Sequence, residues 1–262
     1  METERLLTRI DEIRTYVTQE LITAGITIPR KTPLSCRSAE GQRLSAYFDH
    51  TLLKPEADLY AFDKLCTEAV LWKTCSVCVP PNRVPWVVDR LRGTGVKTCT
   101  VIGFPLGYSE GKSKAEEVRL GREAGCEEFD TVIPIGFLKD GNIPAVFKDL
   151  CWVVEAAEGR LVKVILETCL LSEEEILLGG TLALLAGADM LKTSTGFSAG
   201  GATVEVVKLL RILAGREHGV KAAGGIRDYP TVLAMIEAGA DRIGASATEL
   251  ILSQAEERGK ER

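Results

Sequence analysis

Three short apolar runs, each enclosing one lysine, decide the fold class: LVKVIL (161–166), DMLKTST (189–195) and GVKAAGG (219–225). The enclosed lysines, Lys163, Lys192 and Lys221, follow one another at intervals of 29 residues. A repeat of about 30 residues accommodates one strand, one helix and two loops, which is the unit of a (β/α)8 barrel. We therefore predict an α/β chain that folds as a (β/α)8 TIM barrel, with an N-terminal helical extension.

The lysines also indicate a class of chemistry. A buried strand is a poor environment for a lysine unless its amine reacts, because the charged form loses its hydration there. A neighbouring cation favours the neutral amine further, and only the neutral amine attacks a carbonyl carbon. The same spacing therefore predicts both an architecture and amine-based covalent catalysis.

Length and charge limit the other possibilities. The chain has 262 residues, enough for one barrel plus a short extension or for two small domains. Its net charge is −5 and it has no basic run, so we expect no nucleic-acid partner. The segment METERLLTRIDEIR is charged throughout, and no apolar stretch is long enough to span a bilayer, so we expect a cytoplasmic protein without a membrane partner.

Cysteine and histidine do not predict a metal site. The eight cysteines are expected to be reduced in a cytosol. Cys75 and Cys78 form a C-x-x-C pair, but residues i and i+3 of a strand point to opposite faces. The chain contains only two histidines, so we expect neither a metal nor a cofactor.

The chain divides into an extension, residues 1–43, and a barrel, residues 44–262. Helical spacing of apolar residues predicts a helix over 2–24, and polar residues predict a linker over 29–43. We expect strands over 44–49, 74–79, 97–102, 128–133, 161–167, 188–193, 219–223 and 241–244. Helices are expected over 56–71, 82–92, 110–124, 143–158, 172–186, 203–215, 229–238 and 246–258. A doubly wound open sheet is the alternative, but no G-x-G-x-x-G follows the first strand.

Polar residues gather where this fold carries its active site, at the C-terminal ends of the strands. In chain order, the candidates there are Asp49, Thr51, Cys78, Asp130, Lys163, Glu167, Lys192, Thr195, Gly196, Lys221, Gly224, Gly225, Arg227, Gly244 and Ser246.

Four of these candidates form a catalytic hypothesis. Lys192 ends its strand and is followed by three hydroxyl-bearing residues, so it is the candidate nucleophile. Lys221 would lie beside it and lower its pKa by adding a second positive charge. Asp130 stands in an apolar strand and needs a cationic partner, with which it could transfer protons. Lys163 points into a deeper layer, as a counter-ion to a buried carboxylate or as a further tuning charge.

Structural roles remain open for several residues at this stage. Lys192 and Asp130 could instead form inert salt bridges, and Lys221 could be a surface lysine. Asp49 could cap the helix that follows Pro55 rather than face the site. Glu167 could be structural.

Two glycine-rich turns predict a phosphate site. G-G-I-R (224–227) offers backbone N–H groups beside the Arg227 guanidinium, and G-A-S (244–246) opens a helix whose N-terminus favours anions. They follow the seventh and eighth strands, where this fold commonly binds phosphate. The alternative is that the glycines only permit tight turns.

Eight motifs, in order over about residues 45–252, closely resemble deoxyribose-phosphate aldolase: DHTLLKP (49–55), SVCV (76–79), TVIGFPLG (100–107), VKVILET (162–168), LKTSTGF (191–197), GGATVE (200–205), VKAAGGIR (220–227) and RIGAS (242–246). The resemblance implies a class I aldolase without a metal. Its substrates would be a small phosphorylated sugar and aldehydes, because the family reversibly cleaves 2-deoxy-D-ribose 5-phosphate to D-glyceraldehyde 3-phosphate and acetaldehyde.

Residue roles follow from the same resemblance. Lys192 matches the Schiff-base lysine, and Lys221 matches the proton-relay lysine that depresses the pKa of Lys192. Asp130 matches the acid/base carboxylate, while Gly225, Arg227 and Ser246 fall in the phosphate-binding turns. We expect a homo-oligomer, either a dimer or a tetramer.

The chain departs from the family pattern in three places. Pro80 replaces an asparagine common after SVCV, the C-terminus lacks the tyrosine that assists proton transfer in some members, and the N-terminal extension is longer than in many bacterial members. The extension could pack under the barrel or against a second subunit. Two alternatives stay open, a different Schiff-base barrel aldolase of the transaldolase type and a phosphosugar-binding barrel without catalysis.

Overall fold

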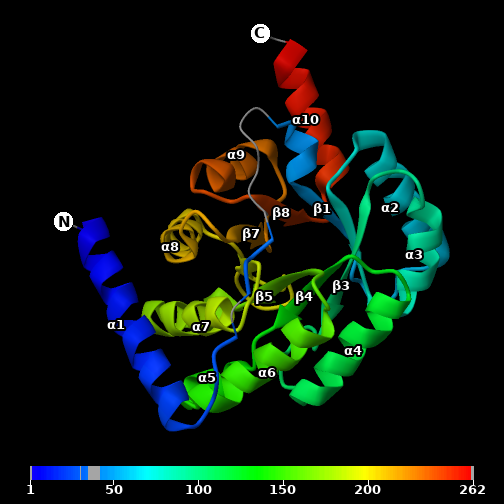
Figure 1. The fold of residues 1–262 in the computed structure, drawn as a ribbon. Coiled ribbons are helices and arrows are strands. Elements are labelled where there is room, and N and C mark those ends of the chain that lie inside the picture. The colour runs from blue at the N-terminus through cyan, green and yellow to red at the C-terminus, as the bar shows by residue number, and fades with distance from the viewer. Residues whose placement is uncertain (1, 30, 35–41, 261–262) are drawn as a thin grey trace.

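A computed structural model of the chain describes residues 2–29, 31–34 and 42–260. Eight parallel strands close into a barrel in the order β1 to β8, with helices around it (Figure 1). The (β/α)8 barrel predicted from the 29-residue spacing is therefore confirmed, and so is the N-terminal helix. The closed ring excludes the open doubly wound sheet.

The barrel is built from short strands: β1 Phe48–Thr51, β2 Ser76–Val79, β3 Lys97–Ile102, β4 Glu128–Val132, β5 Leu161–Ile165, β6 Met190–Lys192, β7 Gly219–Ala223 and β8 Arg242–Ala245. The α-helices are α1 Glu2–Thr23, α2 Leu59–Trp72, α3 Val84–Leu91, α4 Gly111–Glu123, α5 Ile135–Lys139, α6 Ile143–Ala156, α7 Glu173–Leu185, α8 Val204–Ala214, α9 Tyr229–Glu237 and α10 Thr248–Lys260. Single turns of 3₁₀-helix cover Leu44–Tyr47, Pro81–Arg83 and Thr168–Leu170.

Most elements lie within a few residues of their predicted bounds, and three differences from the sequence prediction have a clear local cause. The first strand was expected from residue 44, but Leu44–Tyr47 forms a 3₁₀ turn and β1 starts at Phe48. Helix α2 begins at Leu59 rather than at residue 56, because the Asp58 side chain caps it by accepting a hydrogen bond from the Ala61 N–H (2.9 Å). The short helix α5 was not predicted, since five residues are too few to display a helical period.

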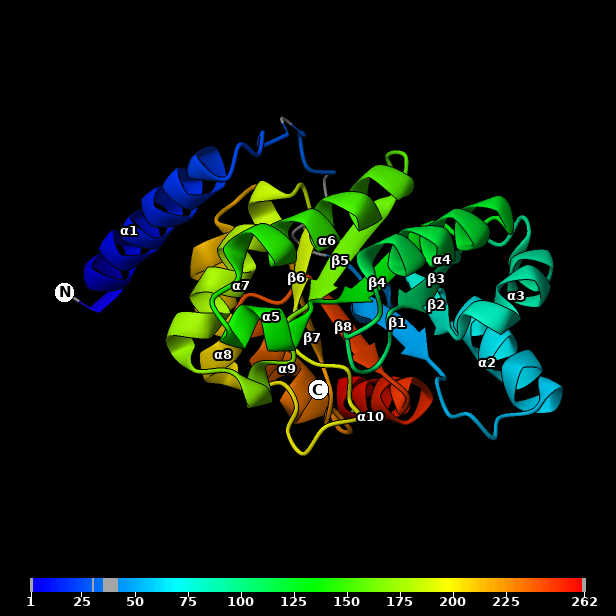
Figure 2. The same cartoon turned by 90° about the horizontal axis from the view of Figure 1, so that it is seen from below.

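The N-terminal helix α1 lies along the outside of the barrel, against α6, α7 and α8 (Figures 1 and 2). Four apolar side chains on one of its faces are buried in the same core as those helices: Ile10, Ile13, Val17 and Leu21. Beyond the helix, Lys31 Nζ donates to Asp189 Oδ2 (2.9 Å) and to the Gly187 carbonyl (2.8 Å), which fastens the extension to the barrel. The expected linker over 29–43 includes residues 30 and 35–41, which lie outside the described residues.

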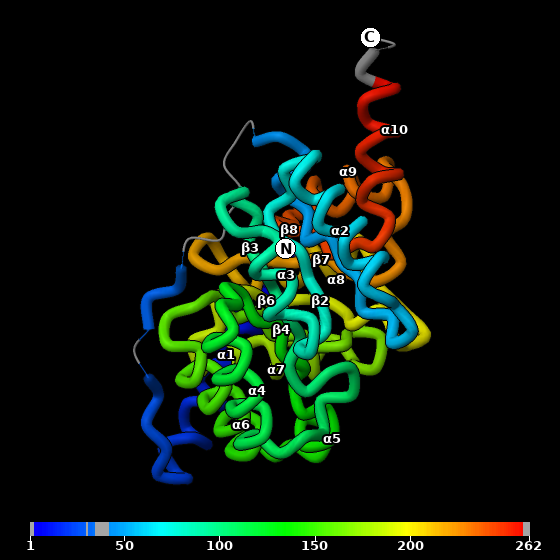
Figure 3. Tube along the Cα trace, turned by 90° about the vertical axis from the view of Figure 1, so that its right-hand side faces the viewer, coloured from blue at the N-terminus to red at the C-terminus, as the bar shows by residue number. Residues whose placement is uncertain are grey.

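The hydrophobic core lies mainly between the strands and the surrounding helices, whereas the barrel interior carries charge. On β4, Phe129 belongs to the apolar core, while the flanking Glu128 and Asp130 are fully buried with their charged partners from other strands. The two-residue period of a strand produces this separation of faces. At the end of the chain, α10 extends past the body of the barrel (Figures 1 and 3). No described helix is long and apolar enough to cross a membrane.

Candidate active site

The three lysines of the 29-residue repeat meet on one carboxylate inside the barrel. Asp130 Oδ2 on β4 accepts hydrogen bonds from Lys192 Nζ on β6 (2.7 Å) and from Lys221 Nζ on β7 (2.6 Å). Asp130 Oδ1 accepts one from Lys163 Nζ on β5 (2.8 Å). The strand register explains this convergence, because Asp130 pairs with Lys163 and Lys192 pairs with Lys221 on neighbouring strands.

A second layer of charge lies one step closer to the N-terminal ends of the strands. It contains Asp49 on β1, Glu128 on β4 and Arg242 on β8, and Arg242 forms ion pairs with both carboxylates. Lys163 Nζ lies 2.7 Å from Glu128 Oε2 and 3.6 Å from Asp49 Oδ2. Lys221 Nζ forms an ion pair with Asp49 as well as with the carboxylate above it. The two layers are therefore one connected network, and Asp49 belongs to it rather than to a helix cap.

Burial and neighbouring charge oppose each other in this network. Burial raises the pKa of Asp130, but Lys163, Lys192 and Lys221 outweigh it and hold this pKa well below its usual range. Burial likewise works to lower the pKa of Lys221, yet Asp130 and Asp49 raise it above its usual range. At neutral pH Asp130 is therefore an ionised carboxylate, and Lys221 is a protonated amine that places a positive charge beside the amine of Lys192.

Two cysteines line the same interior. Cys78 on β2 lies opposite Cys99 on β3, and Cys99 Sγ donates to Asp130 Oδ1 (3.3 Å). Their sulfur atoms and a carboxylate oxygen of Asp130 lie within 4.8 Å of one another, a grouping of possible metal-ligand types. A metal cation there would have to compete with the three ammonium groups that already bind this carboxylate, so the donor set suits amines better than a metal.

The turn that follows Lys192 is held by a carboxylate from the neighbouring strand end. Glu167 follows β5, and its Oε1 accepts the Thr195 N–H (3.3 Å) while its Oε2 accepts the Thr195 hydroxyl. Gly196, next in the chain, is exposed with a positive φ of 84°. Thr51 ends β1 at the same edge of the barrel, and its hydroxyl donates to the Asp49 carbonyl (2.8 Å).

The glycine-rich turns lie at this edge too. Gly224 O accepts a hydrogen bond from the Ala202 N–H (3.0 Å), and a Cβ on Gly201 would lie 2.2 Å from that oxygen, so the loops after β6 and β7 touch through backbone atoms. At Gly244 on β8, an added Cβ would lie 3.0 Å from Lys221 Cε, so the missing side chain leaves room for the lysine.

The remaining residues predicted to bind phosphate lie near the ends of β7 and β8. Gly225, Arg227 and Ser246 are exposed to solvent, unlike the charged network inside the barrel. Their exposure leaves them free to contact a ligand at the barrel mouth.

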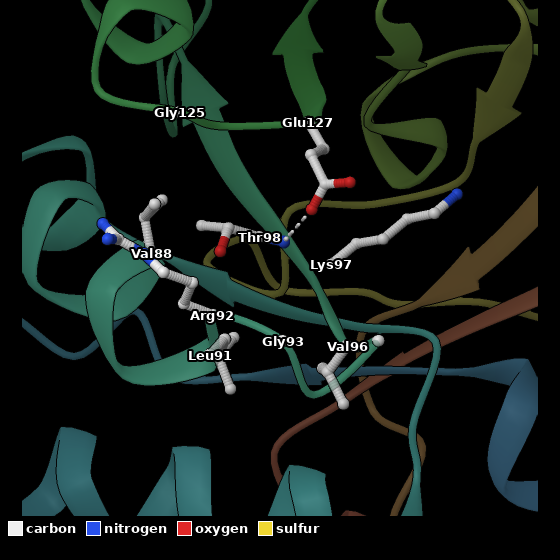
Figure 4. A pocket seen from close by; sticks show the side chains of 10 residues that line it. Val88, Leu91, Arg92, Gly93, Val96, Lys97, Thr98, Gly125 and Glu127 are labelled. Carbon is white, nitrogen blue, oxygen red and sulfur yellow. Dashed lines mark hydrogen bonds between the residues drawn. The ribbon is translucent and has the colours of Figure 1, made fainter.

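A separate cavity of about 320 Å³ lies at the opposite end of the barrel, beside the starts of β3 and β4 (Figure 4). Its polar lining includes Thr98, whose backbone N–H donates to Glu127 Oε2 (3.3 Å), together with Lys97 and Arg92. None of the predicted site residues lines it. The cavity is therefore distinct from the strand ends that carry the lysines.

Sequence reasoning missed Glu128, Arg242 and Cys99, which all touch the network. A signal for the first two was present. Glu128 stands two residues before Asp130, and Arg242 stands two residues before Gly244, so strand alternation places each on the same face as a predicted site residue. Both residues lie one layer below the strand ends, where this fold commonly carries its active site.

The fold and the site define a class of protein, a (β/α)8 barrel with a buried amine–carboxylate network beneath the C-terminal ends of its strands. No protein-family model matches the chain. The chain is 51% identical over 216 residues to deoxyribose-phosphate aldolase of Brevibacillus brevis, covering 82% of this chain and 98% of that protein. It is 50% identical over 217 residues to deoxyribose-phosphate aldolase of Streptococcus sanguinis, covering 83% and 99%. The chain belongs to the deoxyribose-phosphate aldolase family and is a class I aldolase.

Solved structures agree with this assignment. The tetrameric deoxyribose phosphate aldolase of Aeropyrum pernix superposes with a TM-score of 0.76 at 34% identity, covering 81% of this chain and 91% of that chain. A candidate deoxyribose-phosphate aldolase of Coccidioides immitis superposes with a TM-score of 0.82 at 34% identity, covering 94% of this chain and 98% of that chain.

Proposed function

We propose that this enzyme reversibly cleaves 2-deoxy-D-ribose 5-phosphate to D-glyceraldehyde 3-phosphate and acetaldehyde, through a Schiff base on Lys192. Relatives about half identical over nearly their whole length, all named deoxyribose-phosphate aldolase, support the substrate. The convergence of three amines on Asp130 carries the mechanistic part of the proposal.

Charge balance supports Lys192 as the reactive amine. The buried network contains three carboxylates, on Asp49, Glu128 and Asp130. Three other cations, Lys163, Lys221 and Arg242, already balance them. A fourth buried positive charge would be uncompensated and costly, so the network is neutral when the Lys192 amine is neutral. Within the described part of the chain, Lys192 pairs with one carboxylate, whereas Lys163 and Lys221 each pair with two or more.

The chemistry follows from a neutral amine beside a charged acid–base pair. Lys192 Nζ adds to C1 of the open-chain aldehyde, and loss of water yields an iminium ion. The iminium accepts the electron pair of the C2–C3 bond as the C3 hydroxyl loses its proton, so this bond breaks and glyceraldehyde 3-phosphate leaves. The remaining enamine is protonated at carbon, and water then releases acetaldehyde. Asp130 and Lys221 are the groups proposed to move these protons, Asp130 as base and Lys221 as acid.

The phosphate is proposed to bind at the turns after β7 and β8, between the Arg227 guanidinium and the backbone N–H groups near Gly225 and Ser246. These groups are exposed, and anions bind readily to such turns. Replacing Arg227 with alanine is expected to raise KM for the phosphorylated substrate by about 10-fold or more, since a hydrogen bond to a charged group contributes about 1.5–3 kcal/mol. Steady-state kinetics with deoxyribose 5-phosphate measure this, and an unchanged KM would contradict the assignment.

The substrate site is proposed to be shaped from inside the barrel by Cys78, Lys163 and Asp49, and from the rim by Thr51. We further propose residues 1–43 as an N-terminal extension of a catalytic barrel formed by residues 44–262. A cytoplasmic homo-oligomer is also proposed, supported by the tetrameric structure from Aeropyrum pernix.

Reductive trapping tests the proposed function. Sodium borohydride added with acetaldehyde should attach an ethyl group to Lys192, located by peptide mass spectrometry. The Lys192→Ala variant should fold, carry no adduct and lose nearly all retro-aldol activity. A phosphosugar-binding barrel without catalysis would be stabilised by phosphate yet form no adduct, and a label on another lysine would move the Schiff base away from Lys192.

A further inference from the structure

Glu167 is a buried carboxylate that the reaction as described does not use. Its side chain is 1% exposed, and it has no ion-pair partner among the residues that the structure describes. Asp130, by contrast, binds three ammonium groups. Burying a carboxylate without a cation costs free energy unless hydrogen bonds compensate for the lost hydration. The hydrogen bonds of Glu167 therefore indicate the role of this side chain.

The backbone at Glu167 is strained. Its φ and ψ are 56° and 58°, in the left-handed region that residues other than glycine seldom adopt. Such strain persists only where the surroundings impose it, and it clusters at functional sites. Here the flanking chain is fixed by β6 and the turn after it, because the Leu166 N–H donates to the Lys192 carbonyl and the Thr168 N–H donates to the Thr193 carbonyl (both 3.0 Å). The strained residue directs its carboxylate toward the turn that follows Lys192.

The hydrogen bonds of that turn give the Thr195 hydroxyl a single orientation. Thr195 donates its backbone N–H to Glu167 Oε1 (3.3 Å) and its hydroxyl hydrogen to Glu167 Oε2. The Thr195 hydroxyl oxygen accepts the Phe197 N–H (3.0 Å). A threonine hydroxyl has one hydrogen and two lone pairs, so one lone pair remains free. Thr195 lies three residues beyond Lys192, at the same end of the barrel.

We propose that Glu167 is a positioning residue that fixes the Thr195 hydroxyl as a hydrogen-bond acceptor for a substrate hydroxyl next to the Schiff base. The inference rests on the proposed function, because it needs a hydroxylated carbon chain attached to Lys192. The Glu167 side chain takes the hydroxyl hydrogen of Thr195, so the free lone pair selects a donor such as the C3 or C4 hydroxyl of the open-chain sugar. Acetaldehyde has no hydroxyl and gains nothing from this arrangement.

The test compares a substrate with hydroxyls and one without. Glu167→Gln keeps the shape of the side chain but replaces one of the two accepting oxygens with an NH₂ group, which donates and cannot accept a Thr195 hydrogen. We expect kcat/KM for deoxyribose 5-phosphate to fall by about 10- to 100-fold, the effect of a lost hydrogen bond to a charged group. The rate of borohydride trapping with acetaldehyde should stay close to that of the wild type. Glu127→Gln, at the opposite end of the barrel, is the matched control and should change neither quantity.

A double-mutant cycle sharpens the test. Thr195→Val removes the hydroxyl, so Glu167→Gln should add little to the loss already caused by Thr195→Val. Equal losses in cleavage and trapping would mean that Glu167 merely holds the turn, and multiplicative losses would mean that it acts independently of Thr195. Either result overturns the proposal, as does an unchanged kcat/KM in Glu167→Gln.

Two further readouts keep the outcome clear. If Glu167→Gln does not fold, Thr195→Val alone must separate cleavage from trapping, and equal losses in that variant also reject the proposal. A wild-type enzyme that forms no acetaldehyde adduct would reject the Schiff-base function instead, so the two failures are distinguishable.

Discussion

Two regions of the molecule bury lysine amines, and they treat them in opposite ways. Inside the barrel, Lys163 and Lys221 each face more than one carboxylate, and their pKa values are raised above the usual range although burial alone would lower them. In the outer layer, Lys114 on α4 is equally buried, and its hydrogen-bond acceptors among the described residues are Asp149 Oδ2 (3.0 Å) and the Val132 carbonyl (3.0 Å). Burial prevails there, so the pKa of Lys114 is lowered and that of Asp149 is raised.

The difference teaches that the number of carboxylate partners, set against burial, decides whether the pKa of a buried amine in this fold is raised or lowered. One carboxylate does not compensate for the lost hydration, whereas two or three do. Lys192 pairs with one carboxylate among the residues that the structure describes, that of Asp130, and shares it with Lys163 and Lys221. The barrel thus places fixed cations beside its proposed nucleophile, and the one carboxylate that Lys192 contacts is shared with those cations.

The largest effect is expected when the shared carboxylate is removed. Asp130→Asn should lower kcat for cleavage by about 10²–10⁴-fold, the usual contribution of a general acid–base group. The asparagine also leaves three amines without their common anion. Asp149→Asn, which removes the carboxylate of the outer pair, is the control and should retain activity. Steady-state cleavage kinetics decide between them, and near-normal turnover in Asp130→Asn would remove this residue from the mechanism.

Removal of a cation should reveal the same contrast in stability. Lys163→Met leaves Glu128, Asp130 and Asp49 short of one positive charge, and breaking a buried ion pair in this way costs about 3–5 kcal/mol. Lys114→Met strands only Asp149, so we expect a smaller loss. Urea unfolding of both variants at pH 7 compares the two free energies of unfolding, and a larger loss in Lys114→Met would contradict the importance of partner number.

Replacing the outer pair as a whole should be tolerated. The double variant Lys114→Met/Asp149→Leu exchanges an ion pair for apolar side chains, a change that is often neutral or stabilising by about 1–4 kcal/mol. The aliphatic part of the Lys114 side chain also packs against Gly103, where an added Cβ would lie 2.7 Å from Lys114 Cε, so the packing of the shorter methionine against this loop matters. Thermal unfolding and cleavage rate are the measurements, and a loss as large as that of Lys114→Met would refute the expectation.

The smallest effect is expected in how the free energy of unfolding changes as the pH is lowered. Cations hold the pKa of Asp130 low, so its stabilisation is present above the ordinary carboxylate pKa of about 4 and is lost as the pH falls below it. The raised pKa of Asp149 acts the other way, because the folded protein takes up this proton before the unfolded chain does. Unfolding free energies measured from pH 7 to 3 should therefore fall more steeply in Asp149→Asn than in the wild type as pH 4 is approached. The unfolding free energy of Asp130→Asn should fall less steeply below pH 4 than that of the wild type. Parallel curves for the wild type and both variants would contradict the predicted direction of each effect.

The sequence was sufficient for the architecture because the 29-residue spacing of the lysines is a property of the chain alone. Equal spacing puts Lys163, Lys192 and Lys221 on successive strands, and the fold then brings successive strands side by side. The candidate nucleophile and its neighbours followed from that argument and from the family motifs. The role of Asp49 stayed undecided, because a helix cap and a buried counter-ion look alike in a linear pattern.

Periodicity and motif order thus determined by themselves that this chain forms a barrel with amines near its C-terminal rim and belongs among the aldolases. Only the tertiary structure decided which carboxylate each amine touches, that Arg242 and Glu128 complete the network, and that Glu167 reaches Thr195. The physical reason is that charge balance depends on distances between strands far apart in the chain, and barrel closure is what sets those distances: β8 lies beside β1 only once the ring is complete.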